Sequence, residues 1–219
     1  MRMLLGFVLA NVAVASVAAA LLLGREPGPP VIQGVFLPQA KPMEEFSLLD
    51  HHGEAFDQED LKGRWHLISY GFTTCPDICP TTLVELDTMK ATLGPEGEDL
   101  QVLFYSVDHR RDTVHQLASY VPYFNAGFLG LTHKDNPENP HLPFEQSLGI
   151  IAELVPSEDP EAGPLEYSVQ HGITLFLLNP AGQLQAIFKP VRGDNGLPHF
   201  QPEQLAGDYL SIRNYLADS

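Results

Sequence analysis

An uncharged apolar run from Trp65 to Phe72 leads directly to the only two cysteines of the chain, Cys75 and Cys79. A run of this length and composition is typical of a strand that is buried on both faces within a sheet. An amphipathic helix is predicted to follow, because Pro80 suits a first helical turn and an apolar stripe comes after it: Leu83, Leu86, Met89 and Leu93. This strand, turn and helix place thiols near a helix N-terminus, where thiolates are favoured. The chemistry of the protein is therefore expected to involve sulfur.

Strand and helix patterns alternate along the rest of the chain. The pattern predicts a hairpin over 46–56, followed by a strand at 100–107 and a helix at 112–121. A short strand at 128–132 and a short helix at 144–148 come next. Two more strands, 173–179 and 184–189, are joined by a tight Pro-Ala-Gly turn and form an antiparallel hairpin, and an amphipathic helix spans 202–217. The segments 134–143 and 156–166 are predicted surface insertions. This order predicts an α/β fold, a thioredoxin-like mixed sheet flanked by helices.

The N-terminus carries a long segment without charge, from Met3 to Leu23. As a helix it would reach about 30 Å, the thickness of the bilayer core, and it exceeds the usual core of a signal peptide. We expect residues 1–24 to form a transmembrane anchor, with a cleaved signal peptide as the alternative. Residues 25–43 are predicted to be an extended, proline-rich linker, and residues 44–219 the globular domain. The domain is expected outside the cytosol, on the periplasmic side of the inner membrane.

The chain is strongly acidic, with a formal net charge of −16 and a sequence pI of about 4.7. Nucleic-acid binding requires clustered Lys and Arg to contact phosphates. The composition therefore argues against a nucleic-acid partner.

Cys75 and Cys79 are four residues apart, so both sulfurs can close a disulfide or contact one ion. A purely structural disulfide would close a very small loop and would stabilise the fold little. A closed zinc site needs four ligands, and the chain has only two thiols. Cu(I) accepts two thiolates, and an imidazole as third ligand would also allow Cu(II).

His171 is the histidine that we expect to reach the thiols. It stands between Gln170 and Gly172, directly before an apolar strand. In a thioredoxin-like fold the loop at this position faces the cysteine-bearing turn. The alternative is an ordinary surface or hydrogen-bonded histidine, which spacing alone does not distinguish from a ligand.

Three motifs together resemble those of the Sco/SenC family of membrane-anchored copper proteins. They are Phe72-x-x-Cys75-Pro76-Asp77-Ile78-Cys79-Pro80, Ser106-Val107-Asp108-x-x-Arg111-Asp112-Thr113, and His171 before a strand. The resemblance covers residues from about 44 to 217. It implies a copper chaperone that binds one copper ion, Cu(I) or Cu(II), through Cys75, Cys79 and His171. The implied partner is the oxidase subunit that holds the binuclear copper site of cytochrome c oxidase, with another copper chaperone or a thioredoxin-like reductant as a further partner.

The sequence departs from the family pattern at three positions. Gln170 replaces an Asp that is common before the ligand histidine, Gly172 replaces Ser or Thr, and His109 replaces Pro. His109 is either an additional ligand or a solvated loop histidine. Asp108 follows a strand and is either a carboxylate that supports the metal and thiols or an ordinary turn residue.

Two other functions use the same thiols. In a thiol-disulfide oxidoreductase, Cys75 and Cys79 would be a redox-active pair that keeps the cysteines of an oxidase subunit or another chaperone reduced. In a peroxidase, a single thiol reached through Thr-x-x-Cys would suffice for the first step. The second Cys-Pro and the position of His171 count against the peroxidase. The function that we expect is that of a metallochaperone, which needs no catalytic turnover.

Overall fold

The structure is a computed structural model that describes residues 28–133, 138, 140–159, 163–193 and 196–218. The predicted anchor, residues 1–24, lies outside them. Within this part of the chain, no helix has the length and apolar character needed to cross a bilayer. The compact folded unit runs from Pro30 to Asp218.

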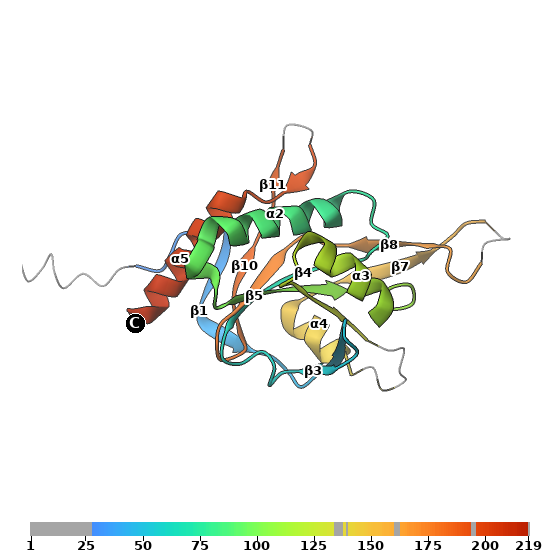
Figure 1. The fold of residues 1–219 in the computed structure, drawn as a ribbon, viewed down its shortest axis with the longest axis horizontal. Helices are drawn as coiled ribbons and strands as arrows, with labels where there is room; N and C mark the ends of the chain where they lie inside the picture. Colours follow the sequence, from blue (N-terminus) through green and yellow to red (C-terminus); the bar gives the residue numbers. More distant parts are fainter. Residues whose placement is uncertain (1–27, 134–137, 139, 160–162, 194–195, 219) are drawn as a thin grey trace, which may run out of the picture. The chain divides into compact units, whose positions relative to one another are not determined.

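An eight-stranded mixed sheet forms the centre of this unit (Figure 1), as the alternating pattern predicted. Strands β4, β5 and β6 are parallel to one another, and the other neighbouring pairs are antiparallel. In spatial order the strands are β1 (Gly34–Pro42), β10 (Gln183–Phe188), β9 (Leu175–Leu178), β4 (Trp65–Gly71), β5 (Leu100–Ser106), β6 (Leu129–Thr132), β2 (Ser47–Asp50) and β3 (Ala55–Asp57).

Helices pack on both faces of the sheet (Figure 1). They are α2 (Ile78–Leu93), the 3-10 helix η1 (Gly94–Gly97), α3 (Val114–Phe124), α4 (Leu142–Leu148) and α5 (Pro202–Ala217). One core layer contains residues of α2, α3 and α5, and the other contains residues of α4, β2 and β3. The apolar stripe of α2 is fully buried in the first layer, as its periodicity predicted.

Strand β1 extends the sheet into the segment that the sequence analysis assigned to a linker. It pairs with β10 at the edge of the sheet, with a register shift between Phe36 and Lys41. The folded unit thus begins before residue 44. The strand was hard to recognise because it is largely exposed and includes Pro38 and Pro42, which are compatible with an edge strand but interrupt a strand pattern.

A separate hairpin is formed by β7 (Ala152–Pro156) and β8 (Tyr167–His171). The predicted insertion 156–166 is therefore mainly the connection between two strands that the sequence analysis missed. Neither strand has a fully buried residue; β7 shows no regular alternation, and β8 alternates only between half-buried and exposed positions. The hairpin projects from one end of the sheet (Figure 1), and His171 is its last residue. A second small hairpin joins β11 (Val191–Arg192) and β12 (Pro198–His199).

The parallel strands β4, β5 and β6 end at the same edge of the sheet. The cysteine-bearing turn follows β4, the loop with Asp108 and His109 follows β5, and His133 follows β6. The carboxyl edge of parallel strands is where open α/β sheets place their sites. The topology therefore gathers the reactive side chains of three loops at one end of the molecule.

Candidate metal centre

The two cysteines flank the start of α2. The helix begins at Ile78, with Asp77 as its N-cap, so that Cys79 lies in the first turn and Cys75 precedes the helix. Both thiols are free, and the backbone N–H of Cys79 donates to Cys75 Sγ at 3.4 Å. Cys79 is buried and Cys75 is half-buried. Gly71 permits this arrangement, because a Cβ atom there would lie 2.5 Å from Cys79 Sγ.

The ring of His171 faces the buried thiol. Its Nε2 atom lies 3.9 Å from Cys79 Sγ, and its Nδ1 atom lies 2.7 Å from the carbonyl oxygen of Gly172. A carbonyl only accepts hydrogen bonds, so Nδ1 carries the proton and the lone pair of a neutral ring is on Nε2, directed to the sulfur side. An ion with bonds of about 2.0 Å to nitrogen and 2.3 Å to sulfur at a trigonal angle separates these atoms by about 3.7 Å. The pair therefore fits a shared metal ion with only a small movement.

Aromatic side chains fix the position of this imidazole. The ring centroids of Tyr70 and Phe72 lie 5.5 and 5.7 Å from that of His171, and the Phe72 contact is edge-to-face. Gly172 allows the close approach of Tyr70, since a Cβ atom there would lie 2.7 Å from the phenol oxygen. The imidazole is thus held in place beside the thiol by packing, before any ligand arrives.

The two thiols have opposite acidities. Interaction with the Cys79 side chain, together with backbone N–H groups of Cys79, Asp77 and Ile78, lowers the pKa of Cys75 to about 5, although burial opposes this shift. The same interaction and burial raise the pKa of Cys79 well above its ordinary value. At neutral pH the pair therefore consists of a thiolate at Cys75 and a thiol at Cys79, with the negative charge near the helix N-terminus.

This asymmetry predicts selective alkylation. Iodoacetamide should modify Cys75 at neutral pH, with a rate that rises with pH and is half-maximal near pH 5, because the thiolate is the nucleophile. Peptide mapping by mass spectrometry after timed exposure at pH 4–9 measures both sites. The denatured chain is the control, in which both thiols should titrate near pH 9. Equal modification of both native thiols would contradict the assignment.

Asp112 organises the turn before the cysteines. Its carboxylate accepts hydrogen bonds from Thr73 N at 2.8 Å, Thr73 Oγ1 at 2.6 Å and Ser106 Oγ at 2.6 Å. The side chain is fully buried, and burial raises its pKa while the hydrogen bonds oppose that shift. Asp112 thereby ties the loop after β5 to the loop after β4, two residues before Cys75.

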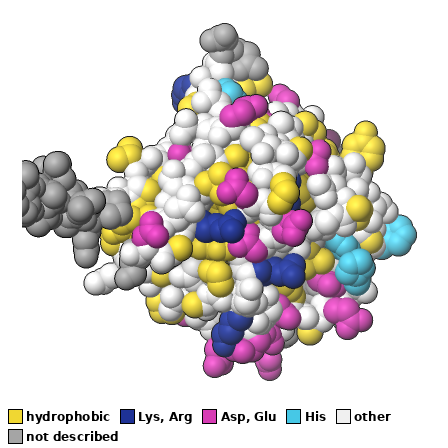
Figure 2. Space-filling view, turned by 60° about the vertical axis from the view of Figure 1, so that its left-hand side comes forward, with side chains coloured by type: hydrophobic (Ala, Val, Ile, Leu, Met, Phe, Trp, Pro, Cys, Tyr) yellow, Lys and Arg dark blue, Asp and Glu magenta, His cyan; other side chains and the backbone are white. Residues whose placement is uncertain are grey.

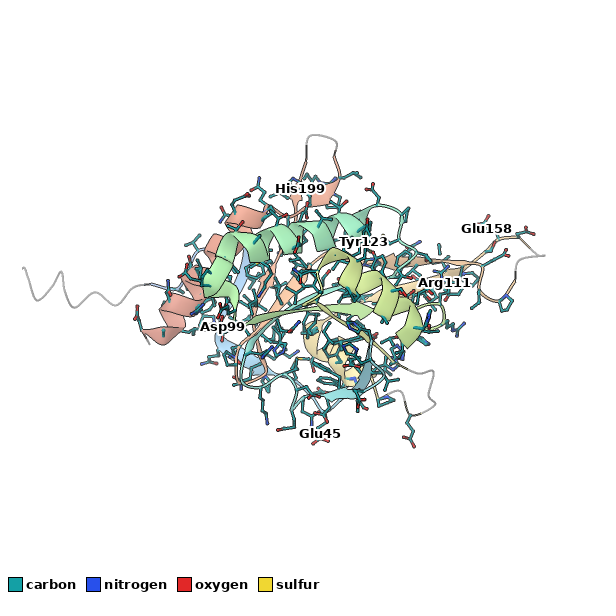
Figure 3. All side chains as sticks on the ribbon, in the orientation of Figure 1. Glu45, Asp99, Arg111, Tyr123, Glu158 and His199 are labelled. Carbon is teal, nitrogen blue, oxygen red and sulfur yellow. The ribbon has the colours of Figure 1, made fainter. Side chains whose placement is uncertain are left out.

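Asp108, the expected supporting carboxylate, has a different set of contacts. It is fully buried, pairs with Arg111 Nε at 2.5 Å and accepts a hydrogen bond from the hydroxyl of Tyr167. The Arg111 guanidinium also stacks on the Tyr167 ring at 4.1 Å and donates to the Tyr167 carbonyl. Figure 3 shows Arg111 beside the β7–β8 hairpin. Asp108 therefore helps to fix β8, the strand that carries His171. Among the described residues, the contacts of its carboxylate are with Arg111 and Tyr167 and not with the thiols.

The structure thus places Cys79 next to both Cys75 and His171. Gln170 is exposed, and His109 instead packs against another histidine, His133, at a ring distance of 4.0 Å. The roles of Asp112 and Tyr167 were not recognised from the sequence. Asp112 was visible only as part of a family motif, and no sequence signal placed Tyr167 near Asp108.

The face in Figure 2 carries scattered acidic side chains and isolated Lys and Arg side chains. It shows no continuous basic patch. This agrees with the acidic composition.

Fold and site together define a thioredoxin-like protein in which a buried thiol lies beside a second thiol and an imidazole. The sequence profile of the SCO1/SenC family matches residues 37–197. The chain belongs to this family.

Known proteins support the same relationship. A protein of Stutzerimonas stutzeri named for copper binding is 37% identical over 172 residues, which cover 78% of this chain and 80% of that protein. The crystal structure of Arabidopsis thaliana ScoI with copper bound is 30% identical, has a TM-score of 0.64 and covers 79% of this chain and 99% of that chain. BsSco, described as a member of the Sco family of cytochrome c oxidase assembly proteins, shares the fold at 21% identity, with a TM-score of 0.55 over 84% of this chain and 96% of that chain.

Proposed function

We propose that this protein is a copper chaperone that binds one copper ion through Cys75, Cys79 and His171 and delivers it to the binuclear copper site of cytochrome c oxidase. The observation that carries the proposal is the 3.9 Å separation of Cys79 Sγ and His171 Nε2, next to the sulfur of Cys75. Two soft thiolates suit Cu(I), and the imidazole extends the site to Cu(II). The copper-bound relative and the oxidase-assembly relative support this assignment by similarity.

The burial of the ligands suggests an order of transfer. Cys75 and His171 are only partly buried, whereas Cys79 is buried. Ligands of the acceptor would therefore displace Cys75 or His171 first and Cys79 last, by exchange of metal–ligand bonds without a change in oxidation state. Both cysteines must be reduced before loading, so copper uptake depends on the thiol redox state.

The setting of this exchange is part of the same proposal. Residues 1–24 would anchor the chain in the inner membrane, and the residues that precede strand β1 would connect the anchor to the domain on the periplasmic side. The partners would be the copper-accepting oxidase subunit and either a second chaperone or a thioredoxin-like reductant.

Copper titration of the fully reduced chain tests the proposal. We expect one equivalent of Cu(I) per chain, and a thiolate-to-Cu(II) charge-transfer band that saturates at one equivalent of Cu(II). Cys75→Ser and Cys79→Ser should each weaken the band, and the double variant should abolish it, because the band requires copper–sulfur bonds at this site. A reduced chain that binds no stoichiometric copper would overturn the proposal in favour of the oxidoreductase described next.

The acidity difference between the thiols favours a second candidate, a thiol-disulfide oxidoreductase. A half-buried thiolate at Cys75 can attack a disulfide of another protein, and the buried thiol at Cys79 can then resolve the mixed disulfide. Cys75 would attack a disulfide of the substrate protein, one substrate thiolate would leave, and Cys79 would then displace the other. The substrate would be reduced and Cys75–Cys79 oxidised to a disulfide, which a reductant of the dithiol class must restore.

A further inference from the structure

A second cluster of metal-binding side chains lies at the same edge of the sheet as the cysteines. His133 directly follows β6, His141 is the N-cap of α4, and Glu145 lies in the first turn of that helix. One possible ligand atom from each of the three lies within 4.8 Å of the others. We propose that His133, His141 and Glu145 bind a divalent transition-metal ion of the zinc type, separately from the site of Cys75, Cys79 and His171.

The two imidazoles are already arranged side by side. The rings of His133 and His141 stack with centroids 3.4 Å apart and planes inclined by 12°, and the ring of His109 lies 4.0 Å from that of His133. His133 and His141 are only 5% and 8% exposed. A ring nitrogen of each histidine lies within 4.8 Å of the other and of a Glu145 oxygen. Because the lone pair of an imidazole nitrogen lies in the ring plane, binding one ion requires one ring to tilt out of the stack.

The carboxylate of Glu145 is also held in position. Tyr105, which is fully buried, donates a hydrogen bond from its hydroxyl to Glu145 Oε1 at 2.6 Å. A donor of this kind orients a ligating carboxylate and leaves its other oxygen for an ion. The carboxylate is largely removed from water, and this burial raises the pKa of Glu145 while the Tyr105 hydrogen bond opposes the shift.

Burying two imidazoles and a carboxylate together has a desolvation cost that apolar side chains would avoid. A bound cation would offset that cost by direct coordination. In a tetrahedral site with bonds of about 2.0 Å, ligand atoms lie about 3.3 Å apart. The present separations, up to 4.8 Å, would therefore close by about 1.5 Å at most, a movement within reach of side-chain rotation.

The donor set determines which ions fit. Imidazole and carboxylate ligands suit Zn²⁺ and Cu²⁺, whereas Cu(I) prefers the thiolates of the other site. Two histidines and one glutamate leave a fourth position open to water. Binding would join the end of β6 to the start of α4. The proposal does not depend on the copper chaperone function, because it involves neither cysteine.

Zinc titration of the full-length chain carrying Cys75→Ser and Cys79→Ser tests this proposal without competition from thiolates. We expect one equivalent of Zn²⁺ by calorimetry, and Co²⁺ should bind at the same site without a thiolate-to-metal charge-transfer band. At about a 100-fold excess of free Zn²⁺ over Kd, the Tm should rise by about 5 °C or more. Glu145→Gln and His133→Asn, introduced separately, should each weaken binding at least about 100-fold.

His52→Ala is the matched control, because His51 and His52 form another close pair of rings, 4.2 Å apart, and His52 is exposed. It should leave Zn²⁺ affinity unchanged. Glu145→Gln keeps an acceptor for Tyr105, and circular dichroism of the metal-free variants verifies that they fold. The proposal is overturned if folded Glu145→Gln and His133→Asn proteins bind Zn²⁺ like the parent, or if the parent binds no stoichiometric Zn²⁺. Copper binding by the thiol site is measured on other variants, so failure of one proposal leaves the other intact.

Discussion

His171→Ala should weaken Cu(II) binding by at least about 100-fold. At one equivalent of Cu(II), the thiolate-to-Cu(II) charge-transfer band should be lost. Changes in groups that merely support a metal ligand often cost 10–100-fold in affinity, and loss of a ligand itself should cost no less. Cu(I) binding should fall far less, because two thiolates alone satisfy that ion. Competition titrations with a chelator of known affinity, performed separately for Cu(I) and Cu(II), measure this difference.

The same substitution separates the two candidate functions. Reduction of a disulfide substrate needs only Cys75 and Cys79, so an oxidoreductase should keep most of its activity in His171→Ala. A metallochaperone should lose Cu(II) retention. His115→Ala is the control, since His115 is an exposed histidine on α3, and it should change neither property. If His171→Ala retains Cu(II) as the parent does, His171 is not a ligand.

The fold was predictable where burial imposes a strong pattern. The β4 strand is fully buried over seven residues, and its apolar run was recognisable without knowledge of its partners. The turn and helix that follow contain the cysteines, so local sequence already placed both thiols together. The boundaries of α5 agree with the prediction because Pro202 marks its first turn and the apolar period continues to its end.

The elements that escaped prediction are those stabilised by partners distant in the sequence. Strand β1 is mostly exposed and acquires its structure by pairing with β10, about 150 residues away. The β7–β8 hairpin depends on Arg111, which contacts the ring and carbonyl of Tyr167. Contacts of this kind leave no local periodicity. The position of His171 could therefore be inferred only from its place before an apolar strand and from a family motif, whereas its orientation required the structure.

The histidines illustrate the same limit. His133 and His141 carry no recognisable metal-binding spacing, and the sequence alone predicts no role for them. They become neighbours because β6 and α4 place them on either side of one connection. Metal sites assembled across a connection of this kind can be found from coordinates but not from short motifs.

Asp112→Ala should cause the largest loss of stability among single substitutions at the site. The change removes a buried acceptor and leaves three donors without it, from Thr73 N, Thr73 Oγ1 and Ser106 Oγ. Because unsatisfied buried donors are costly, we expect a loss of about 3–5 kcal/mol in the free energy of unfolding. Thermal unfolding should show a fall of about 10 °C in Tm.

The effect should extend to the thiols, since Thr73 lies two residues before Cys75. Release of Thr73 frees the turn that aligns the sulfur of Cys75 with the backbone N–H groups at the start of α2. The half-maximal pH for alkylation of Cys75 should then move upward from about 5, toward the value of an ordinary thiol. Asp112→Asn should have a smaller effect, because the amide oxygen can still accept hydrogen bonds while the amide nitrogen cannot.

Asp77→Ala provides the matched control within the same turn. Asp77 is exposed and its side chain makes no capping hydrogen bond, so its removal should change stability by no more than about 0.5 kcal/mol. The backbone N–H group that faces Cys75 remains in this variant, and the alkylation profile should be preserved. A similar loss of stability in Asp77→Ala and Asp112→Ala would show that the turn is sensitive to any substitution. A large loss confined to Asp112→Ala would instead establish the buried carboxylate as the link between the β5 loop and the geometry of the thiols.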